Sequence, residues 1–165
     1  MVDVRFASTL QLMLMLALAE REGSGLLSSS QLADGLATNP SLTRKLLAQL
    51  SAAGLIETTM GARGGSRLAR PAREVTLRDV YLAALGERGL FAGRSGLPHR
   101  CVVTSNIEAM FSELSHELES ATLAVLAERT LAGELERLTR LGGPCAQHRA
   151  KRAKPGKAAA RARRA

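Results

Sequence analysis

The sequence contains few aromatic residues and few cysteines, and both shortages limit what the chain can be. Among 165 residues there are three Phe, one Tyr, no Trp and two Cys. Few aromatics argue against a mainly β protein and against the stacking platforms of single-strand nucleic-acid binders. The two cysteines, Cys101 and Cys145, are too few for a disulfide framework or for an all-cysteine zinc or iron–sulfur site within one chain.

Residue patterns that are typical of enzymes are also absent from the sequence. It has no Ser or Cys triad pattern, no pair of histidines at metal-binding spacing and no pair of carboxylates suited to acid–base catalysis. The segment GARGG lacks the GK[ST] ending of a phosphate-binding loop. We therefore expect a protein with no enzymatic activity, no cofactor and no bound metal.

Positive charge is concentrated near the C-terminal end of the sequence. The formal net charge is +8, and all 15 acidic residues lie before position 137. The last 17 residues contain eight cations and no bulky apolar residue: Arg149, Lys151, Arg152, Lys154, Lys157, Arg161, Arg163 and Arg164. Residues 142–165 are therefore predicted to be a disordered basic tail. Such a tail either solubilises the protein or contacts DNA phosphates without sequence preference.

An apolar run, LMLMLALA, occupies residues 12–19 and lies within a predicted helix over 5–21. The run has two interpretations. It resembles the hydrophobic segment of a signal peptide, although it is too short to span a bilayer and its positive flank is weak. Alternatively, it is a helix buried on most sides, in a core or a dimer interface. The basic tail favours the second interpretation, and we expect no membrane partner.

Two short helices separated by a break follow. The serines at 28–30 are candidate N-caps for a helix over 31–37, and the sequence Thr-Asn-Pro at 38–40 interrupts it. A second helix is predicted from Pro40 or Ser41 to Ala53, with an apolar stripe of Leu42, Leu46, Leu47 and Leu50. This arrangement is typical of a helix-turn-helix.

A predicted β-hairpin comes next. Residues 55–59 and 66–69 are predicted strands, and the glycines at 61, 64 and 65 mark the turn between them. Between positions 44 and 73 a single acid, Glu57, faces six cations: Arg44, Lys45, Arg63, Arg67, Arg70 and Arg73. A helix-turn-helix followed by a basic hairpin predicts a winged helix that contacts duplex DNA. A merely solvated basic face is the alternative.

A long amphipathic helix is predicted over 102–129. Its apolar residues follow a heptad rhythm, at Ile107, Met110, Leu114, Leu118, Ala121 and Val125. A small winged domain cannot bury so long a stripe, so we interpret this segment as a dimerisation helix; packing against residues 5–21 is the alternative. The predicted fold class is mainly α with a small β-hairpin wing: a winged helix-turn-helix plus a long dimerisation helix. The expected domains are 1–85 (DNA-binding, ending in a helix at 76–85), 86–101 (linker loop), 102–141 (dimerisation helices, the last carrying Leu131, Leu135 and Leu138) and 142–165 (tail).

Several sequence blocks resemble the IscR–NsrR–CymR family of bacterial winged-helix transcription regulators, over about residues 1–140. These blocks are LADGLATNPSLTRKLLAQLSAAGLIE, GARGGSRLARP, VTLRDVYLAALG and AERTLAGEL, and TNPSLTRK is more similar to the YwnA-type branch than to IscR itself. The resemblance implies a cytoplasmic homodimer that represses transcription from a palindromic operator in double-stranded DNA. Cluster-binding members have three cysteines before the dimer helix. Here residues 86–101 contain only Cys101, so a cluster is not carried over.

The predicted DNA-binding residues lie on the second helix of the motif and on the wing. The start of that helix enters the major groove in helix-turn-helix docking, where Arg44 or Lys45 either reads guanine or holds a phosphate. The wing would reach the minor groove or its flanking phosphates. The full predicted set is Ser28, Ser41, Leu42, Thr43, Arg44, Lys45, Arg63, Gly64, Gly65 and Arg67.

Cys101 is a possible sensor because it lies just before a long helix, where the partial positive charge favours a reactive thiolate. Some related regulators sense oxidants through cysteine; a plain structural cysteine is the alternative. The sequence thus predicts a dimeric operator-binding repressor, with a possible redox response through Cys101. The alternative function is an architectural, nucleoid-type protein whose DNA binding is dominated by the basic tail.

Overall fold

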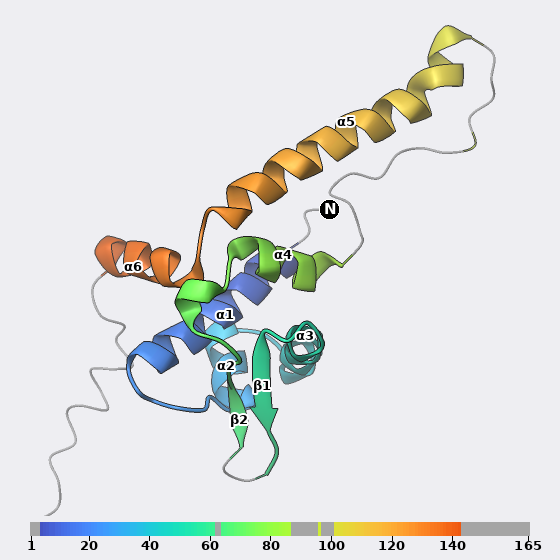
Figure 1. The fold of residues 1–165 in the computed structure, drawn as a ribbon. Helices are drawn as coiled ribbons and strands as arrows, with labels where there is room; N and C mark the ends of the chain where they lie inside the picture. The colour runs from blue at the N-terminus through green and yellow to red at the C-terminus, as the bar shows by residue number, and fades with distance from the viewer. Residues whose placement is uncertain (1–3, 62–63, 87–95, 97–100, 143–165) are drawn as a thin grey trace, which may run out of the picture. The chain divides into compact units, whose positions relative to one another are not determined.

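The computed structural model describes residues 4–61, 64–86, 96 and 101–142. The chain divides into two compact units, 1–135 and 136–165. The described elements are α1 (Arg5–Arg21), α2 (Ser29–Leu36), α3 (Pro40–Ala52), β1 (Ile56–Thr59), β2 (Gly65–Leu68), the 3-10 turn η1 (Ala72–Glu74), α4 (Leu77–Leu85), α5 (Val102–Ala127) and α6 (Leu131–Leu141) (Figure 1). The predicted mainly helical winged fold is therefore confirmed. The predicted linker and tail lie almost entirely outside the described residues.

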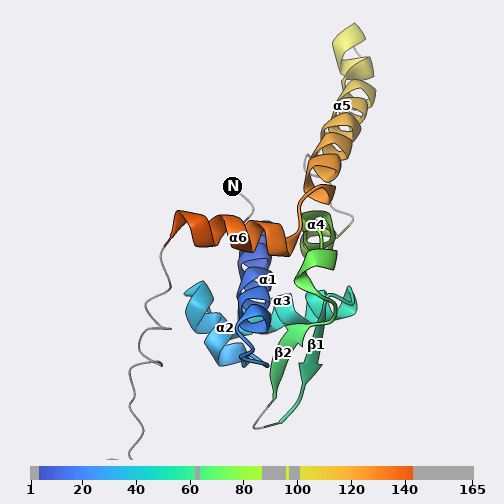
Figure 2. The same cartoon turned by 60° about the vertical axis from the view of Figure 1, so that its left-hand side comes forward.

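The apolar run near the N-terminus forms the central helix of the core. Leu12 and Met13 are fully buried, and Leu16 and Ala17 are 1% exposed. Both views show α1 surrounded by α2, α4 and the hairpin (Figures 1 and 2). This confirms the interpretation of α1 as a buried core helix. In the part of the chain that the structure describes, no helix is long and apolar enough to cross a membrane.

Local capping sets the boundaries of the helix-turn-helix. The hydroxyl of Ser28 accepts a hydrogen bond from the backbone N–H of Gln31, whose side chain in turn accepts one from the Ser28 N–H, so α2 begins with a capping box. Ala37 ends α2 in the left-handed conformation at φ +49°. The carboxamide oxygen of Asn39 accepts from Ser41 N–H at 2.8 Å, and Pro40 opens α3.

The hairpin is a two-stranded antiparallel sheet, and Leu27 forms an isolated bridge to its second strand. Ile56 pairs with Leu68, and Glu57 pairs with Arg67. Leu27 and Ser66 exchange two backbone hydrogen bonds, of 3.0 and 2.8 Å, which join the segment before α2 to β2. The wing is therefore fixed to the start of α2, and this placement brings the hairpin beside α3.

The apolar face of α3 differs from the predicted stripe at one residue. Leu46, Leu47 and Leu50 are buried as expected, but Leu42 is 42% exposed and Thr43 takes its place in the interior at 0% exposure. Leu42 lies four residues before Leu46 and Thr43 lies three residues before it, so either residue fits the helical repeat. The prediction chose the apolar side chain, whereas the direction of the helix places the threonine inward.

Backbone pairing ties the end of α5 to the start of α4. The N–H of Leu77 donates to the carbonyl of Arg129 at 2.9 Å, and the N–H of Leu131 donates to the carbonyl of Val75 at 3.0 Å. Thr76 begins α4 with a capping box that also involves Asp79. Leu126 packs against the core, and Leu131 is fully buried.

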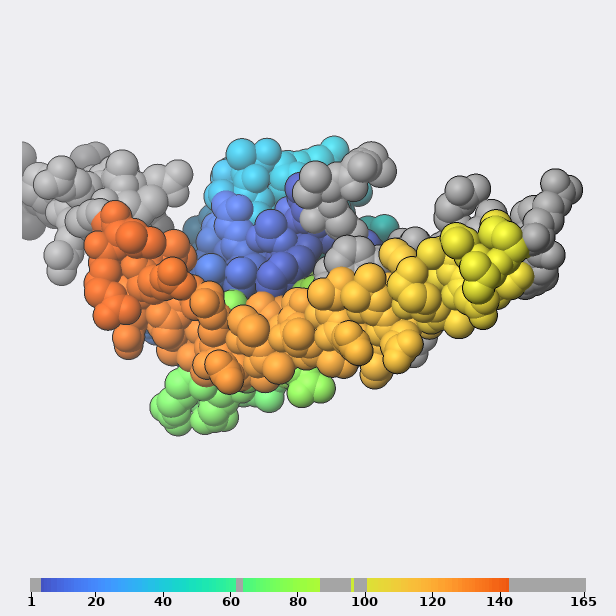
Figure 3. Space-filling view, turned by 90° about the horizontal axis from the view of Figure 1, so that it is seen from above, coloured from blue at the N-terminus to red at the C-terminus, as the bar shows by residue number. Residues whose placement is uncertain are grey.

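Helix α5 is long, and its apolar stripe is exposed. It has 26 residues, two fewer than predicted, and is about 39 Å long. None of its residues is buried. Figure 3 shows that no described element covers the face of α5 turned to the viewer. The predicted stripe remains substantially exposed in this one chain: Met110 50%, Leu114 43%, Leu118 42% and Val125 55%.

Candidate nucleic-acid interface

The exposed side of α3 is the central part of the candidate interface. Ser41, Leu42, Arg44 and Lys45 are exposed on its first turns, as the sequence predicts. Thr43 is not available, because it is fully buried and its hydroxyl lies 3.5 Å from the carbonyl oxygen of Asn39. Its inclusion among the predicted DNA-contacting residues is therefore wrong for its side chain, which a duplex cannot reach.

Within the described part of the predicted basic segment, Arg44 and Lys45 are the cations whose side chains are free for an external anion. Neither has a hydrogen-bond or ion-pair partner among the residues that the structure describes. No acidic residue occurs anywhere in α3. Positive potential at the start of this helix is therefore not neutralised locally, which suits contact with DNA phosphates or guanine.

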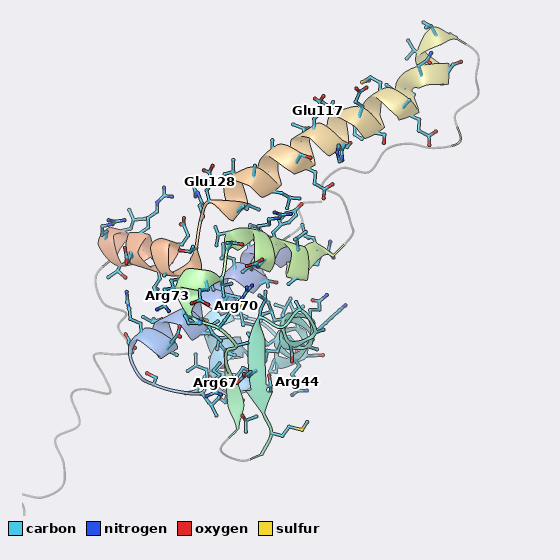
Figure 4. The ribbon with its side chains drawn as sticks, in the orientation of Figure 1. Arg44, Arg67, Arg70, Arg73, Glu117 and Glu128 are labelled. Carbon is cyan, nitrogen blue, oxygen red and sulfur yellow. The ribbon has the colours of Figure 1, made fainter. Side chains whose placement is uncertain are left out.

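Three other cations of the predicted basic segment have acidic partners. Each is exposed and holds one carboxylate: Arg67 with Glu57 at 2.7 Å, Arg70 with Asp79 at 2.9 Å, and Arg73 with Glu74 at 3.2 Å. Figure 4 shows Arg44 and Arg67 at the wing end of the unit, with Arg70 and Arg73 closer to η1. Among the described residues of this segment, the cations without an acidic partner are therefore fewer than the composition suggests, and both lie on α3.

A groove of about 500 Å³ lies between α3, the start of α2 and the wing. Four of the predicted DNA-binding residues line it: Ser28, Arg44, Gly64 and Gly65. Arg67 is outside this groove, because Glu57 and Arg67 occupy the opposite face of the hairpin and line a separate depression of about 410 Å³ with Glu20 and Arg70. Arg63 lies outside the described residues.

Glycine is required at two positions of the wing for steric reasons, which the sequence indicates only in part. A Cβ on Gly64 would collide with the carbonyl oxygen of Thr59, and a Cβ on Gly65 would lie 2.7 Å from that of Leu27. Gly61 has φ +111° at the turn. Gly64 and Gly65 therefore allow close backbone approach rather than left-handed conformations, and Gly65 makes room for the segment at Leu27.

Some residues of the groove were missed at the level of sequence. They are polar or flexible side chains from three separate segments: Ser29, Ser51, Thr58, Thr59 and Met60. Met60 is 94% exposed at the end of the first strand. The alternation of residues along β1 could have indicated Thr58, but the contribution of α2 depends on the pairing of Leu27 with Ser66, for which no sequence signal exists.

Cys101 is exposed and caps the start of α5. The backbone N–H and the hydroxyl of Thr104, and the backbone N–H of Val103, form hydrogen bonds that hold the pKa of the Cys101 thiol below its ordinary value. The Thr104 hydroxyl lies 3.5 Å from Sγ. These contacts favour a reactive thiolate. Cys145, the other cysteine, is outside the described part of the chain.

Comparisons with known proteins agree with this geometry. A family model described as "Rrf2: Iron-dependent Transcriptional regulator" matches residues 5–135. The chain is 29% identical to YffB of Lactococcus lactis, named as an HTH-type transcriptional regulator, over 126 residues that cover 70% of this chain and 81% of that protein. It is 25% identical to YwnA of Bacillus subtilis, similarly named, over 84% of this chain and 99% of the relative. The structure of IscR from T. potens matches with a TM-score of 0.64 and 21% identity, covering 90% and 96% of the two chains.

The family description includes iron, but the cysteines of this chain are too few for an iron–sulfur cluster held by one chain. Iron–sulfur clusters are commonly held by four Cys thiolates. This chain has two cysteines in all. Within the described ranges, no three His, Cys, Asp or Glu residues come together as a possible metal site. The donor set therefore does not fit a cluster held by one chain.

The family match covers the core helix, the helix-turn-helix, the wing and α5, which are the parts just described. The resemblance to IscR-type and YwnA-type regulators is thereby confirmed. The chain belongs to the Rrf2 family of DNA-binding transcriptional regulators, whose members are not enzymes.

Proposed function

We propose that this protein is a homodimeric repressor that binds a palindromic operator, with α3 in the major groove and the wing beside the adjacent minor groove. The proposal rests on two cations, Arg44 and Lys45, which lie on the exposed first turns of α3 and have no acidic partner among the described residues. In helix-turn-helix docking, that end of the recognition helix faces the base edges. The proposed location is the bacterial cytoplasm, where the operator would be reached.

The open stripe on α5 supports the dimer. Four large apolar side chains on this helix are between 42% and 55% exposed: Met110, Leu114, Leu118 and Val125. Their heptad spacing is that of a helix that packs lengthwise against another helix. A second α5 would cover the stripe, and the two-fold axis of such a pair would match the symmetry of a palindrome.

The experiment that tests this function compares the full chain with a variant lacking residues 145–165. For an operator-specific repressor, the shortened protein still protects a discrete sequence upstream of the gene it controls, with weaker overall affinity. A transcription assay with that promoter then shows less transcript when the protein is added. If removal of the tail abolishes nearly all DNA binding, the alternative applies: an architectural protein that binds through residues 149–164.

A redox response through Cys101 is the finer part of this proposal. Oxidation or alkylation would add bulk or charge at the start of α5, the helix proposed to couple the two subunits. Hypochlorite-type oxidants or electrophiles are therefore expected to change operator affinity. A Cys101→Ser variant should bind DNA normally without responding, and Cys145→Ser is the matched control. An unchanged response in Cys101→Ser excludes sensing at this thiol.

A further inference from the structure

The two adjacent cations of α3 point in different directions. Successive residues of an α-helix are about 100° apart around the axis. The residues of α3 that line the groove beside the wing form one face of the helix, at Arg44, Leu47, Ala48 and Ser51. Lys45 is exposed but is not among the residues that line this groove. Arg44 thus faces the wing, whereas Lys45 does not.

Lys45 lies on the side of α3 directed away from the core. The buried residues Thr43, Leu46, Leu47 and Leu50 define the inward side. A wheel at about 100° per residue places Ser41, Lys45 and Ala52 opposite to it. Ser41 and Ala52 are small and exposed, and Lys45 is the one cation on this outward side of α3, with the half-buried Gln49 at its edge. Small neighbours permit the helix to approach base edges closely.

The chemistry of the groove suits a phosphate group. Hydroxyl-bearing residues line it, among them Ser29, Ser51 and Thr58, and no acidic residue is found among its described lining residues. When α3 occupies a major groove and the wing lies at the neighbouring minor groove, the DNA strand that separates the two grooves must pass between them. The guanidinium of Arg44 would meet that strand with a planar donor fork that matches phosphate oxygens.

We propose that Arg44 is a phosphate anchor for the DNA strand between the two grooves, and that Lys45 is the base-reading residue of α3. This inference rests on the proposed function and deepens it, because it assigns affinity to one residue and sequence specificity to its neighbour. The lysine at 45 reads guanine through its O6 and N7 acceptors. Arg44 contributes the same binding affinity for every DNA sequence.

The test uses the full chain and two duplexes of equal length: one that the wild-type protein selects from a random library, and one of scrambled sequence. Arg44→Ala should weaken binding to both duplexes by the same factor and leave the selected sequence unchanged. The salt slope is the slope of the logarithm of the binding constant against the logarithm of the salt concentration. Removing one phosphate-binding cation lowers its magnitude by about 0.9. For a dimer, the affinity ratio between 50 and 200 mM salt should therefore shrink about 12-fold. Arg44→Lys, which keeps the charge, should retain most of the slope.

Lys45→Ala is the matched variant, since both side chains are exposed and neither is expected to affect folding. It should reduce discrimination at one symmetric base position by about 5- to 150-fold. Replacing single phosphates of the selected duplex by neutral methylphosphonates locates the anchor: one such position per half-site should weaken wild type but not Arg44→Ala. An altered base preference or an unchanged salt slope in Arg44→Ala overturns the assignment.

Failure of the proposed function gives a different result. If the wild-type protein selects no sequence, operator recognition and base reading by Lys45 both fail. The salt slope on the scrambled duplex still decides whether Arg44 holds a phosphate.

Discussion

Replacing Leu114 and Leu118 by Glu should convert the protein into monomers that no longer bind the operator. Both side chains are more than two-fifths exposed in one chain, and no residue of α5 is buried. The double variant should therefore keep its monomer fold, with native helix content, although it loses the part of its thermal stability that comes from subunit association. The change acts on subunit association, because it places two acids in the middle of the apolar stripe.

The size of the effect follows from the exposed surface of the stripe. Fully burying a Leu, Val or Met side chain contributes about 1.5–3 kcal/mol. The four stripe residues are about half exposed, so covering the rest is worth roughly 0.7–1.5 kcal/mol each, or about 6–12 kcal/mol for the eight in a dimer. This sum offsets an association cost of about 4–15 kcal/mol. Removing half of it costs at least about 3 kcal/mol, which raises the dimer dissociation constant by about 100-fold or more.

Analytical ultracentrifugation over a range of concentrations measures this shift, and operator binding is measured in parallel. The control carries Ser112→Glu and His116→Glu, which add the same charges at exposed positions on the opposite side of α5. That control should remain dimeric and bind DNA. A Leu114→Glu, Leu118→Glu protein that still sediments as a dimer would show that α5 is not the interface.

Three further predictions follow from individual contacts. Glu57→Gln should break an exposed ion pair with Arg67 that contributes at most about 1 kcal/mol to stability, and DNA affinity should change little because Arg67 lies on the hairpin face opposite to the groove; a large gain in affinity, measured by fluorescence anisotropy, would show that Arg67 contacts DNA. Gly65→Ala should lower the free energy of unfolding by about 1–3 kcal/mol in a urea titration, since its Cβ would collide with a backbone carbonyl; unchanged stability would contradict the close approach. In a Cys145→Ser background, alkylation of Cys101 should accelerate as pH rises through its lowered pKa and level off at a lower pH than in the urea-unfolded chain; identical profiles would refute the effect of the hydrogen bonds at Cys101.

The secondary structure of the winged domain could be predicted well because its signals are local. Ser28 and Thr76 are N-caps, Pro40 opens a helix, and Gly54 follows one; these features fixed most boundaries to within two residues. Leu42 shows where such reasoning fails. Apolar identity favoured Leu42 for the core, but the direction of α3 buries Thr43, and that direction depends on packing against α2, α4 and β1.

The electrostatics of the candidate interface could be predicted only in part. Counting charges gave a basic segment, whereas the structure pairs three of its cations with acids. The pairing of Arg67 with Glu57 follows from the register of the hairpin, and the sequence does not determine that register to the exact residue. The contact of Arg70 with Asp79 depends on how η1 and α4 are placed, which no local pattern encodes.

Operator recognition by a symmetric dimer is tested most directly by selecting duplex DNA from a random library with the wild-type protein at physiological salt. A symmetric dimer should enrich one inverted repeat, whose half-site centres are about one helical turn or a multiple of it apart. Guanine should recur at a fixed position of each half-site, opposite Lys45. Enrichment of no common sequence, or of a single unrepeated site, would contradict operator recognition by a symmetric dimer.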